Sequence, residues 1–136
     1  MPIDRAIADS VAPSTLGGAV TLIGGAGSEV ARALETRQFQ LYLQPQVALP
    51  SRRLVGAEAL LRWRREGQGF ASPPDILQVL ERIGLMAELS RWVIQQAGQV
   101  LATLAAAGCE VSVSVNLMAD DLKDPELPLF IRQTCE

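Results

Sequence analysis

The sequence contains no histidine and only two cysteines among its 136 residues. Without histidine, the chain has no imidazole for acid–base catalysis and cannot build a zinc site of the His/Cys type. Cys109 and Cys135 lack the close spacing of a metal-binding pair, so we expect both to be small, buried apolar residues. Neither residue type therefore indicates a metal site.

Positive charge is also scarce, since 12 basic residues stand against 15 acidic ones and the formal net charge is −3. A general nucleic-acid-binding surface needs a broad basic patch, so we expect no DNA or RNA partner. A local excess of arginine surrounds one apolar run, and it would suffice for a small anionic ligand. These arginines are Arg52, Arg53, Arg62, Arg64 and Arg65.

Long apolar runs are absent as well. No stretch reaches the roughly 18 apolar residues of a membrane-spanning helix, and the N-terminus lacks the basic start and apolar core of a signal peptide. We therefore expect a cytoplasmic protein with no membrane segment. A hydrophobic content of 49% predicts a sizeable buried core, and the length fits one domain.

The first 27 residues differ in composition from the rest, because glycine and proline are frequent among them. We expect residues 1–27 to be a flexible leader, followed by a helix that Ser28 caps and that runs to about Arg37. The run Gly25-Ala26-Gly27 invites a dinucleotide-binding interpretation. Val30 occupies the place of the third glycine and no phosphate-loop lysine follows, so we do not favour it.

Two runs of strand character come next. Residues 39–47 alternate apolar and polar side chains, and residues 54–63 form an apolar strand on which Glu58 and Arg62 point to the same face. The link over residues 48–53 is too short for a parallel crossover. The two strands are therefore expected to be antiparallel neighbours.

Helical periodicity dominates the following part of the chain. We expect a loop over residues 64–72, then helices over about 73–83 and about 87–107, which end at Gly84 and Gly108. The two helices form a long crossover, so the strand that follows them should be parallel to the strand over residues 54–63.

That third strand spans residues 111–117 and alternates strictly, with valines on one face and polar residues on the other. The polar residues are Ser112, Ser114 and Asn116. A last helix is expected from about Asp124 to about Cys135. The order of helices and strands predicts an α/β fold.

Strand parity gathers polar side chains near the C-terminal halves of the strands: Gln44, Glu58, Arg62 and Asn116. In a barrel with helices outside, these side chains point inward, where barrel active sites lie. Glu58 and Asn116 offer oxygen donors that suit Mg²⁺ or Mn²⁺, and Arg62 suits a phosphate. A Glu58–Arg62 ion pair on an exposed face and a structural Asn116 at a strand end remain alternatives.

Five runs in a fixed order resemble the EAL domain family, whose members are cyclic di-GMP phosphodiesterases. The runs are Tyr42-Leu43-Gln44-Pro45-Gln46-Val47, Gly56-Ala57-Glu58-Ala59-Leu60-Leu61-Arg62-Trp63, Glu81-Arg82-Ile83-Gly84-Leu85, Arg91-Trp92-Val93 and Val113-Ser114-Val115-Asn116-Leu117. A Glu-Ala-Leu triplet alone carries no weight. The ordered set, spread over residues 28–136, is highly specific.

The resemblance implies that residues 28–136 are a truncated EAL domain, about half of a TIM-like (β/α)8 barrel with its first strand antiparallel to the next. It also implies that intact relatives hydrolyse cyclic di-GMP to linear pGpG with two Mg²⁺ or Mn²⁺ ions. Glu58 and Asn116 then become metal ligands. The implied substrate contacts are Gln44, Leu60, Arg62 and Pro73. Among them, Arg62 lies near phosphate and Pro73 beside a guanine.

The family pattern continues with a further metal-binding Glu, an Asp-Asp pair followed by Phe-Gly, and a catalytic-site lysine, and none of these motifs occurs in this sequence. Asp120 and Asp121 precede Leu122 and Lys123 instead, and we interpret them as a solvated acid cluster at a helix start. We therefore expect the 136 residues to be inactive alone, so whether the chain is an enzyme stays open.

A barrel half also leaves strand edges without partners, which predicts self-association or a partner protein that completes it. The alternative function is a non-catalytic module for cyclic di-GMP signalling or protein interaction.

Overall fold

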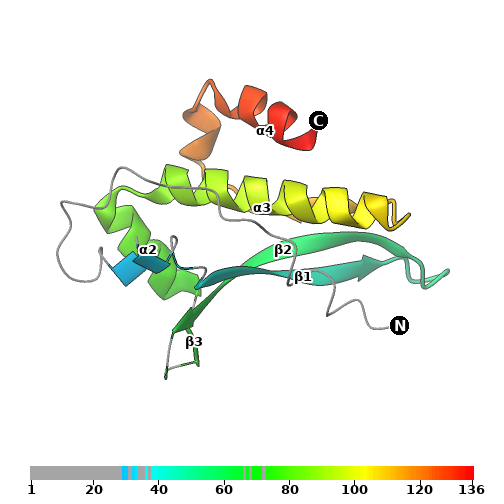
Figure 1. The fold of residues 1–136 in the computed structure, drawn as a ribbon, viewed down its shortest axis with the longest axis horizontal. Helices are drawn as coiled ribbons and strands as arrows, with labels where there is room; N and C mark the ends of the chain where they lie inside the picture. The colour runs from blue at the N-terminus through cyan, green and yellow to red at the C-terminus, as the bar shows by residue number, and fades with distance from the viewer. Residues whose placement is uncertain are drawn as a thin grey trace. The chain divides into compact units, whose positions relative to one another are not determined.

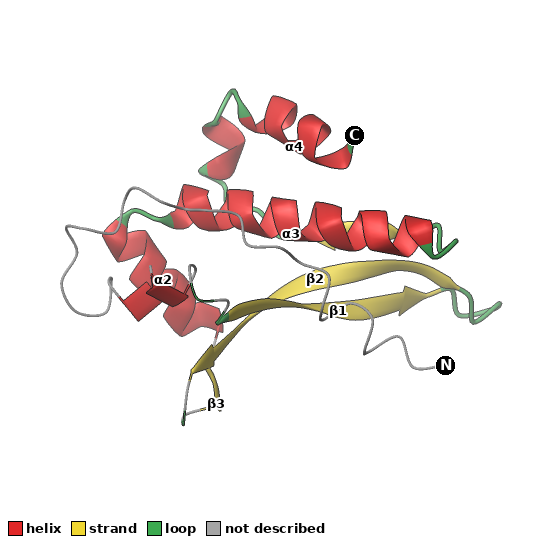
Figure 2. Ribbon diagram, in the orientation of Figure 1, coloured by secondary structure: helices red, strands yellow, loops and turns green. Residues whose placement is uncertain are grey.

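The computed structural model describes residues 29–30, 32–33, 36, 38–65, 67, 69–71 and 73–136, with the backbone alone at positions 65, 71, 73 and 75. Its elements, drawn in Figures 1 and 2, are β1 (Phe39–Val47), β2 (Leu54–Arg65), β3 (Gly69–Ala71), α2 (Pro73–Ile83), α3 (Met86–Ala106), β4 (Ser112–Val115), η3 (Asp121–Lys123) and α4 (Leu127–Cys135). The α/β class expected from the sequence is confirmed. The expected leader over residues 1–27 and its glycine run lie outside the described residues.

The chain forms two compact units. Among the described residues, the first unit holds Leu41–Leu60 and Ser90–Glu136, and the second holds the residues up to Gln40 together with Leu61–Leu89. The strands β1 and β2 and the helix α3 each contribute residues to both units. The first unit therefore contains β4 and α4, whereas the second contains β3 and α2.

In the first unit, β1 and β2 are neighbouring strands of a hairpin that turns over residues 48–53. The backbone N–H of Ala48 donates to the carbonyl of Arg53 (2.9 Å), so the end of β1 meets the start of β2. Strand β4 pairs with β2 in parallel, with Glu58 opposite Ser114 and Ala59 opposite Val115. The antiparallel hairpin and the parallel third strand both match the expectation from link length.

Helix α3 carries the predicted apolar stripe. Its buried members in the first unit include Val93, Ala97, Val100 and Leu104. Because β2 and β4 are parallel, the connection between them has to cross one face of the sheet, and α3 provides that crossing. The stripe and the crossing together explain why one face of β2 is buried, with Ala57 and Ala59 pointing into it.

Helix α4 packs against α3 at Gly98, and Figure 1 shows the two helices side by side. A Cβ atom added at Gly98 would lie 2.7 Å from Cγ2 of Thr134 and 3.0 Å from its carbonyl oxygen. Only glycine therefore allows this close approach of the two helices.

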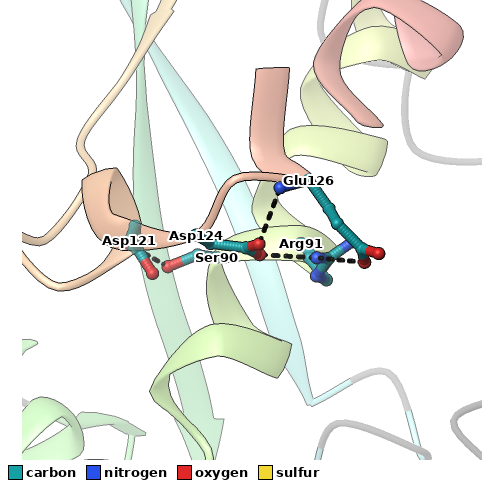
Figure 3. Close-up of polar contacts among 5 residues, drawn as sticks. All are labelled: Ser90, Arg91, Asp121, Asp124 and Glu126. Atoms are coloured by element: carbon teal, nitrogen blue, oxygen red, sulfur yellow. Dashed lines mark hydrogen bonds and ion pairs between the residues drawn. The ribbon is translucent and has the colours of Figure 1, made fainter. Parts of the chain in front are cut away.

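Arg91 holds the start of α4 from the same helix α3 (Figure 3). Its Nη2 lies 2.6 Å from Oδ2 of Asp124 and 4.0 Å from Oε2 of Glu126. The guanidinium also lies 4.8 Å from the ring centroid of Phe130, in cation–π geometry. Together with Gly98, these contacts anchor α4 at both ends.

The second unit contains an aromatic pair and a hairpin that the sequence did not predict. Phe39 and Trp63 stack with their ring centroids 5.4 Å apart, and Nε1 of Trp63 donates to Oε1 of Gln38 (3.2 Å). Residues 64–72, expected to be a loop, contain the end of β2 and the antiparallel strand β3, with Arg64 opposite Phe70. The expectation was wrong because this hairpin has almost no apolar alternation; glycines with positive φ (Gly67 and Gly69) make the turn instead.

The second unit is otherwise built on α2, which ends as predicted at Gly84, where φ is 70°. The N–H of Gly84 donates to the carbonyl of Glu81, and the N–H of Leu85 donates to that of Leu80. These bonds cap the helix in the manner of a Schellman motif. Ile76 and Leu80 are fully buried and form the core beneath α2.

The two cysteines correct another expectation from the sequence. Cys109 is half-buried and Cys135 is exposed, and both thiols are free. Cys109 follows the end of α3 and Cys135 is the last residue of α4, so neither lies on a buried helix face. Separately, none of the described helices combines the length and apolar composition needed to cross a membrane.

Candidate functional site

Glu58 and Asn116 come together in the first unit at neighbouring parallel strands. Glu58 lies in β2, and Asn116 is the first residue after β4. The side-chain Nδ2 of Asn116 donates to Oε1 of Glu58 over 2.9 Å. Glu58 is half-buried and Asn116 is exposed, so the pair is open to solvent on one side.

Strand alternation explains why these two side chains are available. Ala57 and Ala59 of β2 are only 6% and 4% exposed. Glu58, which lies between them, and Leu60, which follows Ala59, are half-buried. The polar and apolar faces of β2 thus differ as the sequence predicts. Leu60 shares the face of Glu58 by parity, and Gln44 on β1 is exposed. The first unit therefore contains four of the six residues expected at the site.

The other two expected residues, Arg62 and Pro73, belong to the second unit. Arg62 is half-buried, and its Nη1 donates to the neighbouring carbonyl of Leu61 over 2.9 Å. Pro73 is the first residue of α2, as a proline in the first helical turn allows. The assignment of Arg62 to phosphate and of Pro73 to a guanine stays a prediction.

The donor chemistry of Glu58 and Asn116 fits a hard divalent cation. Asn116 uses its Nδ2 in the bond to Oε1 of Glu58, which leaves its own Oδ1 and the Oε2 of Glu58 for another partner. Carboxylate and amide oxygens are the ligands that Mg²⁺ and Mn²⁺ prefer. Across the described part of the chain, no group of three or more His, Cys, Asp or Glu side chains could hold a metal ion. Glu58 and Asn116 thus supply two oxygen ligands of the type that these ions prefer.

A second carboxylate of the same unit, Asp121, lies a few residues after Asn116, and the sequence interpretation misjudged it. Asp121 was expected to be solvated, but it is only 7% exposed. Its Oδ2 accepts a hydrogen bond from Oγ of Ser90 over 2.7 Å (Figure 3). The same oxygen accepts another from the backbone N–H of Met118, also over 2.7 Å. Ser90 itself is buried on α3. A serine on an otherwise apolar helix stripe was the signal in the sequence that a buried polar partner exists.

Its neighbour Asp120 behaves as expected from the sequence. Asp120 is exposed and its Oδ1 lies 2.6 Å from Nζ of Lys123. The hydrogen bond and charge of Lys123 lower the pKa of Asp120, and the same contact raises the pKa of Lys123. Two adjacent acids at the start of one short helix thus have opposite environments, which the sequence alone does not distinguish.

Comparison with known proteins identifies the family. The family model of the EAL domain matches residues 28–136 of this chain. The biofilm architecture maintenance protein MbaA of Vibrio cholerae is 39% identical over 101 residues, which are 74% of this chain and 13% of MbaA. The cyclic di-GMP phosphodiesterase PA2567 of Pseudomonas aeruginosa is 37% identical over 98 residues, 71% of this chain and 17% of that protein. The chain thus spans less than a fifth of the length of these relatives.

Solved structures lead to the same family. The PaMucR phosphodiesterase in complex with c-di-GMP matches with a TM-score of 0.69 and 31% identity, over 78% of this chain and 43% of that one. The FimX EAL domain of Xanthomonas citri in complex with c-diGMP matches with a TM-score of 0.67 and 29% identity, over 79% and 42% of the two chains. The family match, the sequence identity and the shared fold agree, and this chain belongs to the EAL domain family as a partial EAL domain.

Proposed function

We propose that this chain contributes the Glu58–Asn116 part of a metal-dependent site for cyclic di-GMP in an EAL phosphodiesterase domain. The observation that carries the proposal is the 2.9 Å contact between the two side chains at adjacent parallel strands. Support comes from relatives, because PA2567 is named a cyclic di-GMP phosphodiesterase and PaMucR was solved with c-di-GMP.

In this proposal, Glu58 and Asn116 hold a Mg²⁺ or Mn²⁺ ion through oxygen atoms. The hydrogen bond between them fixes the orientation of the Asn116 amide and therefore the direction in which Oδ1 of Asn116 points. A bound divalent ion would lower the pKa of a water molecule and offset the negative charge of the phosphodiester during hydrolysis to pGpG.

Four further residues complete the proposed ligand contacts. Arg62 binds a phosphate through its guanidinium after releasing the carbonyl of Leu61, which its Nη1 contacts here. Leu60 lies on β2 with Glu58, Gln44 lies on the neighbouring strand β1, and Pro73 lies beside a guanine. The proposal includes two expectations from the sequence. The sheet and its helices form half of a barrel, and the protein is cytoplasmic.

We also propose that the 136 residues do not hydrolyse cyclic di-GMP by themselves. Glu58 and Asn116 supply two donors, whereas a two-metal mechanism needs several more carboxylates to hold both ions. Incubation of the purified chain with cyclic di-GMP and Mn²⁺, followed by chromatography for pGpG, tests this point. Metal-dependent formation of pGpG at the level of an intact EAL enzyme would contradict it.

Binding of cyclic di-GMP tests the proposed site directly. Calorimetry should detect binding to the 136-residue chain that strengthens with Mn²⁺. Glu58→Ala should abolish the dependence on metal, and Arg62→Ala should weaken binding about 10-fold or more, because a charge-assisted hydrogen bond is lost, worth roughly 1.5–3 kcal/mol. Matched controls are Glu110→Ala and Arg82→Ala, which change exposed residues of the same types. If Glu58→Ala binds with the metal dependence of the wild type, the proposed site is wrong.

The alternative, a protein-interaction module, draws on the exposed sheet of the first unit. Large apolar side chains there are exposed, among them Val47, Leu54 and Val55. Within the described sheet, β4 pairs with β2 alone, and an unpaired strand edge can accept another chain. Sedimentation velocity should then show dimers or larger species that Val55→Lys reverts to monomer. A monodisperse wild-type monomer would speak against this alternative.

A further inference from the structure

Asp121 connects helix α3 to the segment that carries Asn116. One oxygen of its carboxylate, Oδ2, accepts from Oγ of Ser90 on α3 and from the backbone N–H of Met118 after β4. Figure 3 shows the contact between Asp121 and Ser90. Asp121 and Ser90 are 7% and 6% exposed, so the bond between their side chains is shielded from solvent.

The same bonds close a short turn just after Asn116. The backbone N–H of Asp121 donates to the carbonyl of Met118 over 3.1 Å, while the N–H of Met118 donates back to the carboxylate over 2.7 Å. Both backbone polar groups of Met118, the N–H and the carbonyl, are thus hydrogen-bonded to Asp121. A buried carboxylate with two short donors holds those donors in a narrow geometry.

Asn116 therefore lies between two fixed points. On one side, β4 is held by its parallel pairing with β2, up to Val115 opposite Ala59. On the other side, Asp121 holds Met118, two residues further along the chain. Asn116 itself is exposed, so packing cannot fix its side chain, and its bond to Glu58 depends on where the backbone places it.

We propose that Asp121 and Ser90 are positioning residues for Asn116, and this inference rests on the proposed role of Asn116 as a metal ligand. Residues that orient a metal ligand without touching the ion typically change metal affinity by about 10-fold or more when they are lost. Asp121 acts here through the backbone of Met118, and Ser90 fixes the direction of the carboxylate from α3.

The experiment measures binding of Mn²⁺ alone to the 136-residue chain, by electron paramagnetic resonance titration. We expect Asp121→Ala to weaken Mn²⁺ binding about 10-fold and Asp121→Asn about 3-fold, because the amide oxygen still accepts but gives weaker bonds than a carboxylate. Asp120→Asn, at the residue just before η3, is the matched control. It removes an exposed acid that contacts Lys123 and should change the affinity less than 2-fold.

A second control separates positioning from general stability. Gly98→Ala forces α4 away from α3, since its new Cβ would meet Thr134, but it touches neither Asp121 nor Asn116. It should lower the unfolding temperature and leave Mn²⁺ affinity unchanged when measured well below the unfolding transition. A merely structural role for Asp121 predicts the same behaviour for Asp121→Ala. Unchanged Mn²⁺ affinity in folded Asp121→Ala and Asp121→Asn would therefore overturn the inference.

Nuclear magnetic resonance in the absence of metal gives a readout that is independent of the proposed function. The side-chain amide signals of Asn116 should shift in Asp121→Ala and in Ser90→Ala, but not in Asp120→Asn. If the wild type binds no Mn²⁺, the proposed metal site fails and these signals alone decide on the positioning role. If Asp121→Ala does not fold, Ser90→Ala and Asp121→Asn test the positioning role in its place. Side-chain amide signals of Asn116 that are unchanged in both variants would overturn that role.

Discussion

Glu58 and Asp121 are carboxylates of the same unit, and their surroundings differ in an instructive way. Each accepts a hydrogen bond from a neutral side chain of a neighbouring segment, Asn116 at 2.9 Å and Ser90 at 2.7 Å. Glu58 is half-buried beside an exposed partner, whereas Asp121 is 7% exposed and accepts a second bond from a backbone N–H. Solvent access and the number of donors, rather than residue type, separate a carboxylate available to a ligand from one engaged by the fold.

The largest expected effect that would test this difference is on stability. Asp121→Ala leaves the buried Ser90 hydroxyl and the part-buried Met118 N–H without their acceptor, so we expect the free energy of unfolding to fall by about 3 kcal/mol. Glu58→Ala leaves only an exposed amide without its partner and should cost less than about 0.5 kcal/mol. Urea unfolding followed by tryptophan fluorescence measures both values. Equal losses in the two variants would show that the two carboxylates are not different in kind.

The matched controls come from neighbouring residues of the same type. Glu110→Ala and Asp120→Asn each change an exposed acid and should leave the urea midpoint close to that of the wild type. Ligand binding should rank the variants the other way, since Glu58→Ala removes a proposed ligand and Asp121→Ala only displaces one. Opposite orders of Glu58→Ala and Asp121→Ala in stability and in ligand binding would distinguish the two carboxylates most clearly.

Much of the fold was readable from the sequence because strand and helix periods are strong where one face is buried. The alternation along residues 39–47, the helical stripe through Val93 and Leu104, and the short link 48–53 predicted β1, α3 and the antiparallel hairpin. The long helical crossover predicted the parallel pairing of β2 and β4. Each of these rests on local spacing or on connection length, which a single sequence contains.

What could not be predicted depends on contacts between distant residues. Asp120 and Asp121 are adjacent and chemically identical, but only Asp121 meets Ser90, which lies 31 positions earlier in the chain. The strand β3 is only three residues long and exists through its register with β2, for which its sequence holds no alternation. Cys135 lies at the exposed end of α4, although cysteine is usually a buried residue type.

For the candidate site, strand parity explained why Glu58 and Leu60 share a face, and parallel pairing explained why Asn116 reaches Glu58. The roles of the ligand contacts came from the family resemblance and stay predictions. Sequence reasoning missed the support behind the site. Ser90 on the predicted apolar stripe signals a buried polar partner, but the identity of that partner, Asp121, depends on a contact between residues 31 positions apart.

The smallest expected effect concerns a third carboxylate, Asp124, which lies between the two extremes. Its side chain is about one-third exposed; its Oδ1 accepts from the backbone N–H of Glu126 (2.9 Å) and its Oδ2 from Arg91 (2.6 Å). The bond from Glu126 and the contact with Arg91 lower the pKa of Asp124, and partial desolvation opposes them. Because the pKa is lower in the folded state than in the unfolded chain, this group stabilises the protein above its ordinary pKa of about 3.9.

That stabilisation should disappear as the pH falls through the lowered pKa of Asp124, when the carboxylate takes up a proton and its bonds to Glu126 and Arg91 weaken. We expect the urea midpoint of the wild type to decrease from about pH 5 downward, and Asp124→Asn to flatten part of that decrease. Asp120→Asn should flatten it less, although the pKa of Asp120 is also lowered, because an exposed i,i+3 pair with Lys123 is held by solvent-screened contacts alone. A pH profile of Asp124→Asn that overlays the wild type would place Asp124 with the exposed acids. The start of α4 would then be held mainly by the contact of Arg91 with Phe130.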